Sequence, residues 1–344
     1  MADSFDGGVP GRRGPPAAGD STATTEEAKG RHWLTDAAVR LVKEKPLGSV
    51  GAAIVLLLFI TGIFADLSWV GLPDVGLAPY HYNEVNMKIR LAAPSLDHPL
   101  GGDHMGRDML SRIIYGARIS MFIGVFGTAI STTLSLLIGM TCGYLGGKFD
   151  LIVQRFVDAW ISFPMLFIYL TVIAIIGGGM LQLVLVLGIS SGIGASRGPR
   201  ALVFWIKESA YVEAARAAGA PTSRILTRTL LPNIMPVIIL GMSMGMGGMI
   251  MAEAGLSFLG FGLPPPTPSW GGMISGPGRV YMVQAPWMLL WPGIALSLVI
   301  YGINVFGDAL RDLLDPRLRG GLGSYRGIPK KKLEAIRRKS GEQA

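Results

Sequence analysis

The sequence predicts an all-α integral membrane protein with six transmembrane helices. Of its 344 residues, 50% are hydrophobic and only 16% are charged, and the mean hydropathy is +0.46. A soluble domain usually carries about 25% charged residues. The apolar residues also gather in runs that approach the roughly 20 residues needed to cross a bilayer as a helix. Composition and clustering together indicate a chain that crosses a membrane several times.

Six apolar runs define the predicted spans. A polar stretch at 66–117, too long for a simple turn, separates the first span from the second. A short polar break, GGGMLQ, separates the third from the fourth, and the fifth begins near Asn233. The predicted spans are residues 47–65, 119–142, 156–177, 181–196, 233–256 and 287–307, within a transmembrane domain at 47–312.

Basic residues predict the orientation, because lysine and arginine collect in short cytoplasmic loops. The segment before the first span, the loops after spans two and four, and the C-terminal tail are basic, and the alternate short loops are not. Both termini are therefore predicted to be cytoplasmic, with 66–117 outside the cytoplasm. That loop does hold four basic residues, but long loops are not governed by the charge rule.

The two ends of the chain are predicted to lie outside the spans. Residues 1–30 are rich in Gly, Pro, Ser and Thr without an apolar period, which predicts a disordered cytoplasmic tail rather than a signal peptide. Residues 31–46 place apolar side chains on one stripe and predict an interfacial amphipathic helix, with an ordinary exposed helix as the alternative. Residues 313–344 are predicted to form a basic cytoplasmic tail.

The loop at 205–232 is neither apolar nor disordered in composition. Its first part, KESAYVEAARAAG, has strong helix formers and ends at Gly219, a residue suited to the left-handed helix stop. Pro221 prevents this helix from continuing, and SRILTRTLLP begins a second one. Glu213 and Arg216 are spaced to pair on the exposed side. We predict a small, rigid helix that another protein can approach closely, with an amphipathic linker as the alternative.

This loop resembles the EAA loop of ABC-importer permeases, the coupling helix that docks on an ATP-hydrolysing subunit. The matching residues are Glu213-Ala214-Ala215, Gly219 and Leu231-Pro232, and Pro232 lies 19 positions after Glu213.

Three further stretches resemble C-type subunits of dipeptide, oligopeptide and nickel permeases. That subfamily usually has threonine where this chain has Gly102, a change that removes a hydroxyl and adds flexibility. The resemblance covers about residues 33–320. The stretches are HPLGGDHMGRDMLSRIIYGARISM (98–121), AGLSFLGFGLPPPTPSWGGMI (254–274) and DALRDLLDPRLRG (308–320).

The resemblance implies a type I ABC-importer transmembrane fold and a permease subunit for short peptides, with nickel or glutathione as neighbouring cargo. It implies a homologous second permease, two ATP-binding subunits, an extracytoplasmic peptide-binding protein and the lipid of a prokaryotic cytoplasmic (inner) membrane as partners. ATP and Mg²⁺ are expected on the partner subunits, and no cofactor or metal on this chain. The implied ATPase-coupling residues are Glu213, Ala214, Ala215, Arg216, Gly219, Ala220 and Pro221.

The fifth span supplies the candidates for a gate or pathway. Glu253 is ionisable within a span, which is by default a functional hypothesis, although a structural role near the outer interface is the alternative. Methionines offer a soft, adaptable surface that lines a path or packs between helices. The methionine candidates are Met242, Met246 and Met249, and glycines 241, 245 and 248 are expected to permit close helix approach.

The loop before the second span is predicted to be mainly structural. Asp103, Gly106 and Arg107 form a glycine-punctuated turn with internal ion pairs, and Asp108 is a suitable helix N-cap, with substrate contact as the alternative. His98, His104 and Asp103 have no spacing that fixes a metal site. Trp270 follows prolines 264–266, and its indole is expected at the headgroup level.

Several other classes of protein are disfavoured. The nearest match to a phosphate loop, CGYLGGKF, has Cys142 and Phe149 where glycine and serine or threonine are required, so the chain is not predicted to be an enzyme. One cysteine cannot form an internal disulfide, and no basic, aromatic face indicates nucleic acid. A stand-alone secondary transporter requires charges in mid-span and an internal repeat, and a membrane-embedded enzyme requires paired polar residues there. Neither pattern is evident.

Overall fold

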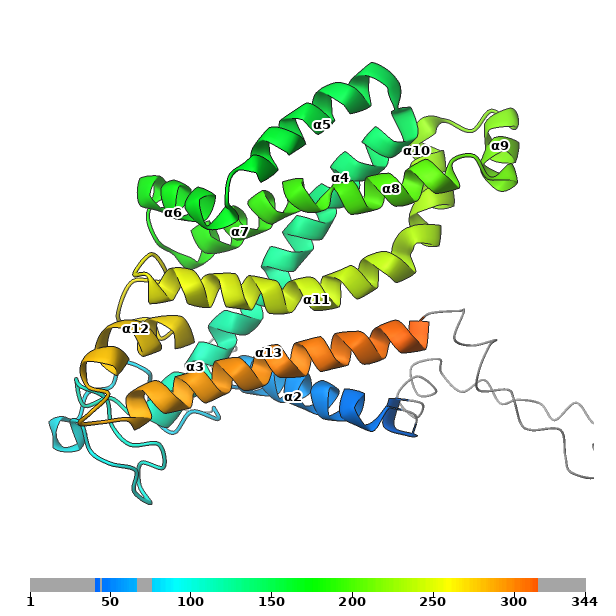
Figure 1. Ribbon diagram of the computed structural model, residues 1–344. Coiled ribbons are helices and arrows are strands. Elements are labelled where there is room, and N and C mark those ends of the chain that lie inside the picture. The colour runs from blue at the N-terminus through cyan, green and yellow to red at the C-terminus, as the bar shows by residue number, and fades with distance from the viewer. Residues whose placement is uncertain (1–40, 44, 67–75, 315–344) are drawn as a thin grey trace, which may run out of the picture.

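The computed structural model is an elongated bundle of helices (Figure 1). It describes residues 41–43, 45–66 and 76–314, so the predicted tail at 1–30, most of 31–46 and nearly all of 313–344 lie outside the described residues. The helices are α2 (Pro46–Ile63), α3 (Met109–Phe122), α4 (Thr128–Leu145), α5 (Gly147–Ser162), α6 (Met165–Ile176), α7 (Met180–Ala195), α8 (Arg197–Ile206), α9 (Ala210–Ala217), α10 (Thr222–Arg224), α11 (Leu231–Phe258), α12 (Trp270–Val280) and α13 (Trp287–Leu314), with a 3-10 turn at Met87–Ile89 and π-helical segments at Ile123–Gly127 and Ile225–Leu230.

Five helical segments of the described chain are long and apolar enough to cross a membrane, and a bent pair makes a sixth if it counts as one span. The prediction of an all-helical, multi-pass membrane protein is therefore confirmed. In Figure 1 successive segments run in alternating directions between two ends of the bundle. We call these the α9 end, where α2 also begins and α13 ends, and the cap end, where the cap (residues 76–108) lies.

The third predicted span, 156–177, differs most from the structure. α5 and α6 are two helices that meet at 87°, and α5 already begins at Gly147. Pro164 explains the break, because proline disfavours helical backbone in the residue before it, and Phe163 is extended (φ −87°, ψ 134°). The second span also begins earlier than predicted, at Met109, so the last part of the 66–117 loop is helical.

Glycines allow two helices near the chain ends to pack closely. A Cβ atom at Gly51 on α2 would lie 2.7 Å from the carbonyl oxygen of Gly302 on α13. One at Gly302 would lie 2.5 Å from the Ile54 side chain. At the α9 end of the same pair, Lys45 Nζ lies 2.6 Å from Asp312 Oδ2. Small residues at such positions bring two backbones together within lipid.

A buried ion-pair cluster organises the cap. Asp103 Oδ1 accepts hydrogen bonds from the backbone N–H groups of Met105 and Arg107, both at 2.8 Å, and its Oδ2 accepts one from Arg107 Nε at 2.6 Å. Arg112 Nε lies 3.7 Å from the same Oδ2. Gly106 supplies the left-handed turn (φ +76°), as its type favours. These are the internal ion pairs of the turn-and-cap interpretation.

Asp108 and Trp270 fasten the cap end to the bundle. Asp108 is the N-cap of α3, its Oδ2 accepting from Ser111 N at 2.8 Å, and its Oδ1 lies 2.9 Å from His98 Nδ1. Trp270 is only 2% exposed, and its Nε1 donates to the carbonyl of Ile113 at 3.1 Å. The indole therefore lies inside the protein and is not exposed at a lipid surface, because α12 folds back against α3 and buries it.

Gly102 is a site of close backbone approach and not of added flexibility. A Cβ atom there would lie 1.8 Å from the carbonyl oxygen of Ile89, and the Gly102 carbonyl accepts a hydrogen bond from Trp287 Nε1 at 3.1 Å.

We therefore expect Gly102→Thr to destabilise this chain, because the cap has to move away from Ile89 to admit a side chain. Overpacking of this kind costs about 1–3 kcal/mol. The measurement is the thermal unfolding midpoint in detergent, with Gly276→Ala as the control, since a Cβ at Gly276 meets nothing within 4 Å. An unchanged midpoint for Gly102→Thr would contradict the close approach.

Candidate coupling helix and transmembrane cavity

The helix α9 has a fully formed stop signal at its C-terminus. Gly219 is left-handed (φ +75°), its N–H donates to the Arg216 carbonyl at 3.0 Å, and the Ala220 N–H donates to the Ala215 carbonyl at 3.1 Å. This pair of bonds is the Schellman arrangement, which satisfies carbonyls at a helix end. α9 is thus a closed unit of eight residues at the α9 end of the bundle (Figure 1).

One side chain anchors α9 and the remaining surface is open. Val212 is completely buried among Val203, Ile225 and Leu230, and Ala215 and Ala220 pack against the same cluster. Two residues of its first turn are exposed, Ala210 and the aromatic Tyr211. The exposed residues that follow are small or charged: Glu213, Ala214, Arg216, Ala217, Ala218, Gly219 and Pro221.

The predicted pair between Glu213 and Arg216 is not formed within the described chain. The Arg216 guanidinium instead lies over the Tyr144 ring of α4, with its Cζ 5.7 Å from the ring centroid. A pair three residues apart on an exposed helix stabilises it by only about 0.2–0.5 kcal/mol, so a contact to another element competes easily. Arg216 therefore connects α9 to α4.

The helix before α9 packs directly on α4. A Cβ atom at Gly139 would lie 2.3 Å from the Ser196 carbonyl oxygen, and one at Gly143 would lie 2.7 Å from the Arg200 carbonyl oxygen. These two glycines, four residues apart, let the α4 and α8 backbones touch. On the other side of α8, Arg200 donates two hydrogen bonds of 2.6 Å to Asp150 on α5. α8 is thus fixed to both neighbours.

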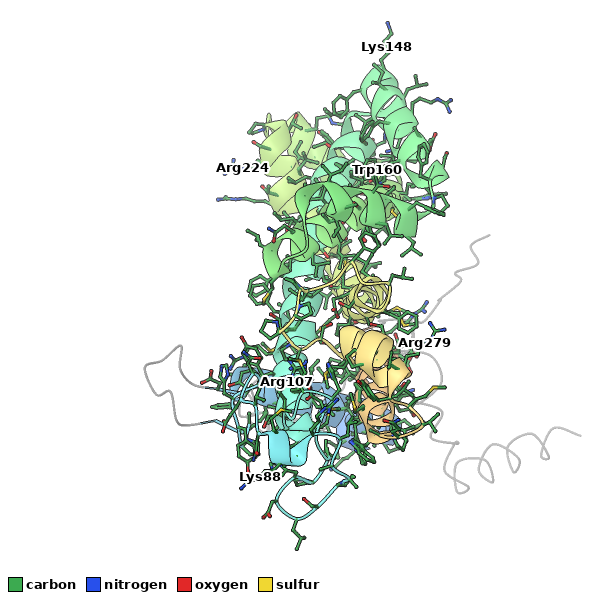
Figure 2. The ribbon with its side chains drawn as sticks, turned by 90° about the vertical axis from the view of Figure 1, so that its left-hand side faces the viewer. Lys88, Arg107, Lys148, Trp160, Arg224 and Arg279 are labelled. Carbon is green, nitrogen blue, oxygen red and sulfur yellow. The ribbon has the colours of Figure 1, made fainter. Side chains whose placement is uncertain are left out.

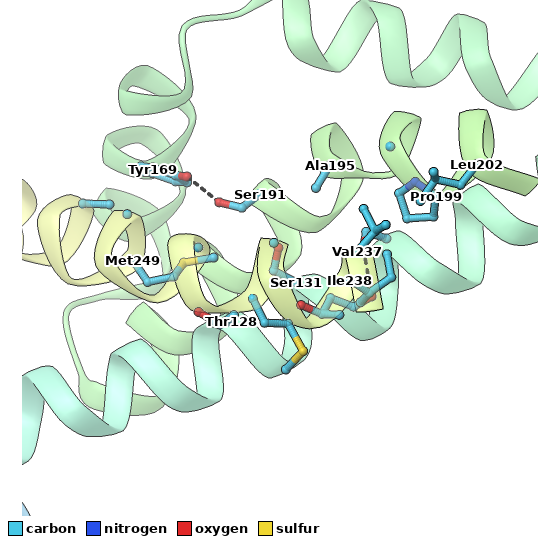
Figure 3. Close-up of a pocket in the computed structure, with 18 residues that line it drawn as sticks. Thr128, Ser131, Tyr169, Ser191, Ala195, Pro199, Leu202, Val237, Ile238 and Met249 are labelled. Atoms are coloured by element: carbon cyan, nitrogen blue, oxygen red, sulfur yellow. Dashed lines mark hydrogen bonds between the residues drawn. The ribbon is translucent and has the colours of Figure 1, made fainter. Parts of the chain in front are cut away.

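A cavity of about 510 Å³ opens beside this contact, between α4, α6, α7, α8 and α11 (Figure 3). Figure 3 shows Thr128 and Ser131 of α4 facing α11, and Tyr169 of α6 meeting Ser191 of α7. The Tyr169 and Ser191 hydroxyls are 2.8 Å apart. The cavity-lining residues that carry a hydroxyl group are Thr128, Ser131, Thr132, Ser135, Tyr169 and Ser191.

The cavity wall is mainly apolar, with hydroxyl groups set among aliphatic side chains and glycines. Among the described residues, no Asp, Glu, Lys, Arg or His lines it. Thr128 is 5% exposed, and its Oγ1 is buried with no hydrogen-bond partner in the described chain. A buried hydroxyl without a partner costs free energy. The sequence analysis missed this lining, although hydroxyls at 128, 131, 132 and 135 have the helical spacing of one face.

The methionine candidates divide between the cavity and the core. Met242 and Met249 line the cavity. Met246 does not line it: it packs in the hydrophobic core against the π-helical segment, where a Cβ atom at Gly124 would lie 3.0 Å from its Cγ. Residues 242, 246 and 249 have the i, i+4, i+7 spacing of one helical stripe, so their spacing in the sequence could not separate Met246 from the other two.

Glycines 241, 245 and 248 have a role other than the predicted close approach. All three line the cavity, and a Cβ atom at Gly241 or Gly248 would meet nothing within 4 Å. Gly248 is exposed within this chain. The glycines keep one wall of the cavity free of side chains.

Glu253 is enclosed by protein rather than close to water. It is completely buried on α11, its Oε1 accepts a hydrogen bond from Ser257 Oγ at 2.6 Å, and its Oε2 has no partner in the described chain. It does not line the cavity. The predicted access to the outer interface is lost because the loop after α11 and α12 folds over it. The geometry therefore gives Glu253 a structural position.

Comparison with known proteins places the chain in a family. Residues 135–320 match the binding-protein-dependent transport system inner membrane component family. The chain belongs to this family. It is 34% identical to a dipeptide transport system permease protein of Alkalihalophilus pseudofirmus over 82% of this chain and 90% of that protein. It is 32% identical to an oligopeptide transport system permease protein of Haemophilus influenzae, over 85% and 91% respectively.

A third relative carries a different name. A glutathione transport system permease protein of Escherichia coli O6:K15:H31 is 34% identical over 82% of this chain and 90% of its own length. Each of these relatives aligns with this chain over about nine tenths of its own length. The matched region, 135–320, includes α9 and most of the cavity wall.

The contact between α4 and α8 leads to a prediction for this permease. Gly143→Leu should destabilise the protein by about 2–3 kcal/mol, because its side chain would collide with the Arg200 backbone. The unfolding midpoint in detergent measures this effect. Gly293→Leu on α13 is the matched control, since nothing lies within 4 Å of a Cβ there. Equal midpoints for the two variants would show that α8 does not touch α4.

Proposed function

We propose that this permease forms half of an ATP-driven import path for short peptides across the cytoplasmic membrane of a prokaryote. The observation that carries the proposal is the α9 knob, closed at Gly219, anchored by Val212 and connected through α8 to the wall of a transmembrane cavity. Family membership and relatives named for dipeptides and oligopeptides support the cargo class.

The proposal includes six spans with both termini in the cytoplasm. It counts α5 and α6 as one broken span. The start of α2 and the end of α13 lie at the α9 end, and basic residues such as Lys148 and Arg224 extend from the bundle there (Figure 2). Such residues are typical of the cytoplasmic side. The cap then faces outward, toward an extracytoplasmic peptide-binding protein.

The proposed complex contains a homologous second permease and two ATP-binding subunits. The cavity is open on one side in this chain, and the second permease would complete it. ATP and Mg²⁺ would bind to the ATP-binding subunits, one of which would contact the exposed face of α9 through Glu213, Ala214, Arg216, Gly219 and Pro221. Lipid would cover the apolar outer faces of α2 and α13.

Alternating access follows from the packing. Movement of a docked ATPase displaces α9, and α8 follows because Val212 and Val203 share one core cluster. Since α8 touches α4 at Gly139 and Gly143, α4 moves with it, and both helices line the cavity. A displacement of α9 thus changes the shape of the path, and this coupling requires no charged side chain in the cavity wall.

The lining favours peptides over the alternatives. Hydroxyls accept and donate, so they can contact peptide groups whatever the side chains are. In the described part of the chain, nickel ligands such as His, Cys or carboxylates do not line the cavity. A stand-alone transporter that couples to ions needs carboxylates or histidines at the cavity, and the described lining has neither. Glutathione, named for one relative, is itself a small peptide.

The open glycine wall provides a test of the path. Gly248→Leu should leave the unfolding midpoint unchanged, because a Cβ there meets nothing, yet reduce peptide uptake by reconstituted complex at least tenfold by filling the cavity. Gly255→Leu is the control on the same helix, since it also has open space but lies away from the cavity. Full uptake by Gly248→Leu would contradict the path.

The exposed alanines provide a test of the coupling. Ala217→Trp should abolish peptide-dependent ATP hydrolysis and reduce co-purification of the ATPase subunits, because a bulky side chain keeps the partner surface away from α9. Ala53→Trp on the exposed face of α2 is the control. Both variants should unfold at the wild-type temperature. If Ala217→Trp supports uptake at the wild-type rate, α9 is not the coupling element.

A further inference from the structure

The cap end holds a second, smaller cavity of about 150 Å³ that the proposed transport path does not use. The cap, the start of α3, the loop after α11, and α12 surround it. Met105, about half exposed, and the partly buried His104 stand at its border with the outside. Met109, Met273 and Met288 form an apolar part of its wall.

The charges that line this cavity do not balance. Among the described residues, Asp103 is the one carboxylate on its wall, and it faces two guanidinium groups, Arg107 and Arg112. The three side chains are 3%, 5% and 7% exposed. The described wall therefore carries one net positive charge that no carboxylate on it balances, and a charge in a confined site without a counter-ion is costly. The nearby Glu253 hydrogen bonds to Ser257 and pairs with neither arginine.

The two arginines differ in how many of their hydrogen-bond donors have an acceptor in the described chain. Arg112 Nη1 donates to the carbonyls of Tyr82 and Pro266, at 3.1 and 3.3 Å, so it holds the cap to the loop after α11. Arg107 donates only through Nε to Asp103 within the described chain, which leaves both of its terminal nitrogens without an acceptor. A guanidinium has five donors and recognises a carboxylate with two of them at once.

The remaining lining is neutral. Thr267 and Ser269 contribute hydroxyls, and His104 contributes a buried Nδ1 without a partner in the described chain. Burial lowers the pKa of His104, and the nearby Arg107, Arg112 and Arg90 lower it further while Asp103 opposes them. The imidazole is therefore neutral near pH 7. The site offers donors and one uncompensated positive charge beside methionine side chains.

We propose that this cavity binds the terminal carboxylate of a short peptide at the cap end, with Arg107 as the residue that contacts it. This inference rests on the proposed function. A volume of about 150 Å³ corresponds to about five water molecules, since each takes about 30 Å³. The cavity therefore holds a carboxylate and one small apolar side chain, but not a whole peptide. Figure 2 places Arg107 within the cap, whereas Lys88 extends from its outer edge.

Binding to the permease complex in nanodiscs, without the binding protein, tests this. The probes are radiolabelled phenylalanyl-alanine, whose C-terminal side chain is small, and its C-terminal amide. The wild-type complex should bind the free acid at least tenfold more tightly than the amide. Arg107→Lys retains the charge beside Asp103 but loses the planar fork, so it should bind the acid about tenfold more weakly and discriminate little. Thr267→Val should weaken binding of the free acid two- to fivefold, because it removes a hydroxyl and leaves the ion pairs intact.

Arg90→Lys is the matched control, because Arg90 lies in the same cap and donates to the His104 carbonyl but does not line the cavity. It should bind like the wild type. Equal affinity for acid and amide in the wild type overturns the site, as does an Arg107→Lys complex that still discriminates. If Arg107→Lys changes only the affinity of the permease complex for the binding protein, Arg107 contacts a carboxylate of that protein and not of the peptide. The proposal is then also wrong.

Uptake measured on the same complexes with the binding protein present separates the two proposals. A wild-type complex that imports peptide but binds acid and amide equally keeps the proposed function and loses the carboxylate site. A complex that discriminates in binding yet drives no ATP-dependent uptake loses the proposed function and keeps the site.

Discussion

The direct contact between the α4 and α8 backbones is the constraint on which the rest of the structure depends. It exists because Gly139 and Gly143 carry no side chains where the Ser196 and Arg200 carbonyls pass. Interiors packed at this density transmit displacement instead of absorbing it. The contact lies between α9, which is exposed to a partner, and the cavity, whose wall α4 and α8 both supply. A looser contact would let α9 move without any change in the cavity.

The same logic explains why α9 is so small. Its single buried side chain, Val212, is enough to join it to the core cluster, and the Schellman bonds at Gly219 stop fraying that would otherwise absorb movement. Apart from Ala215, which packs against the same cluster, and Arg216, which contacts Tyr144, the residues of α9 are left for a partner. The helix contributes little stability of its own, and its order comes from the elements around it, as is usual for helices this short.

The sequence predicted those features that local chemistry determines. Hydropathy located the apolar segments, glycine type predicted the stop at Gly219, and Asp108 was identified as an N-cap because its helix follows directly. Features that depend on the direction of a side chain in three dimensions were not predictable. Trp270 and Glu253 were expected near water but are buried by α12 and the loop before it, which fold back on the bundle. Pro164 did carry a signal for the break between α5 and α6 that hydropathy averaging hides.

Charge is segregated along the molecule, and this has a physical consequence. Arginines and carboxylates cluster in the cap and at the α9 end, while the cavity between them offers hydroxyls, glycines and methionines. A fixed charge at membrane depth would be expensive in the empty cavity and would hold an oppositely charged cargo too strongly for release. Hydroxyl contacts are individually weak, about 0.5–1.5 kcal/mol each, and can be exchanged one at a time. Strong recognition is therefore compatible with passage only when it is confined to the ends, where the structure places its charges.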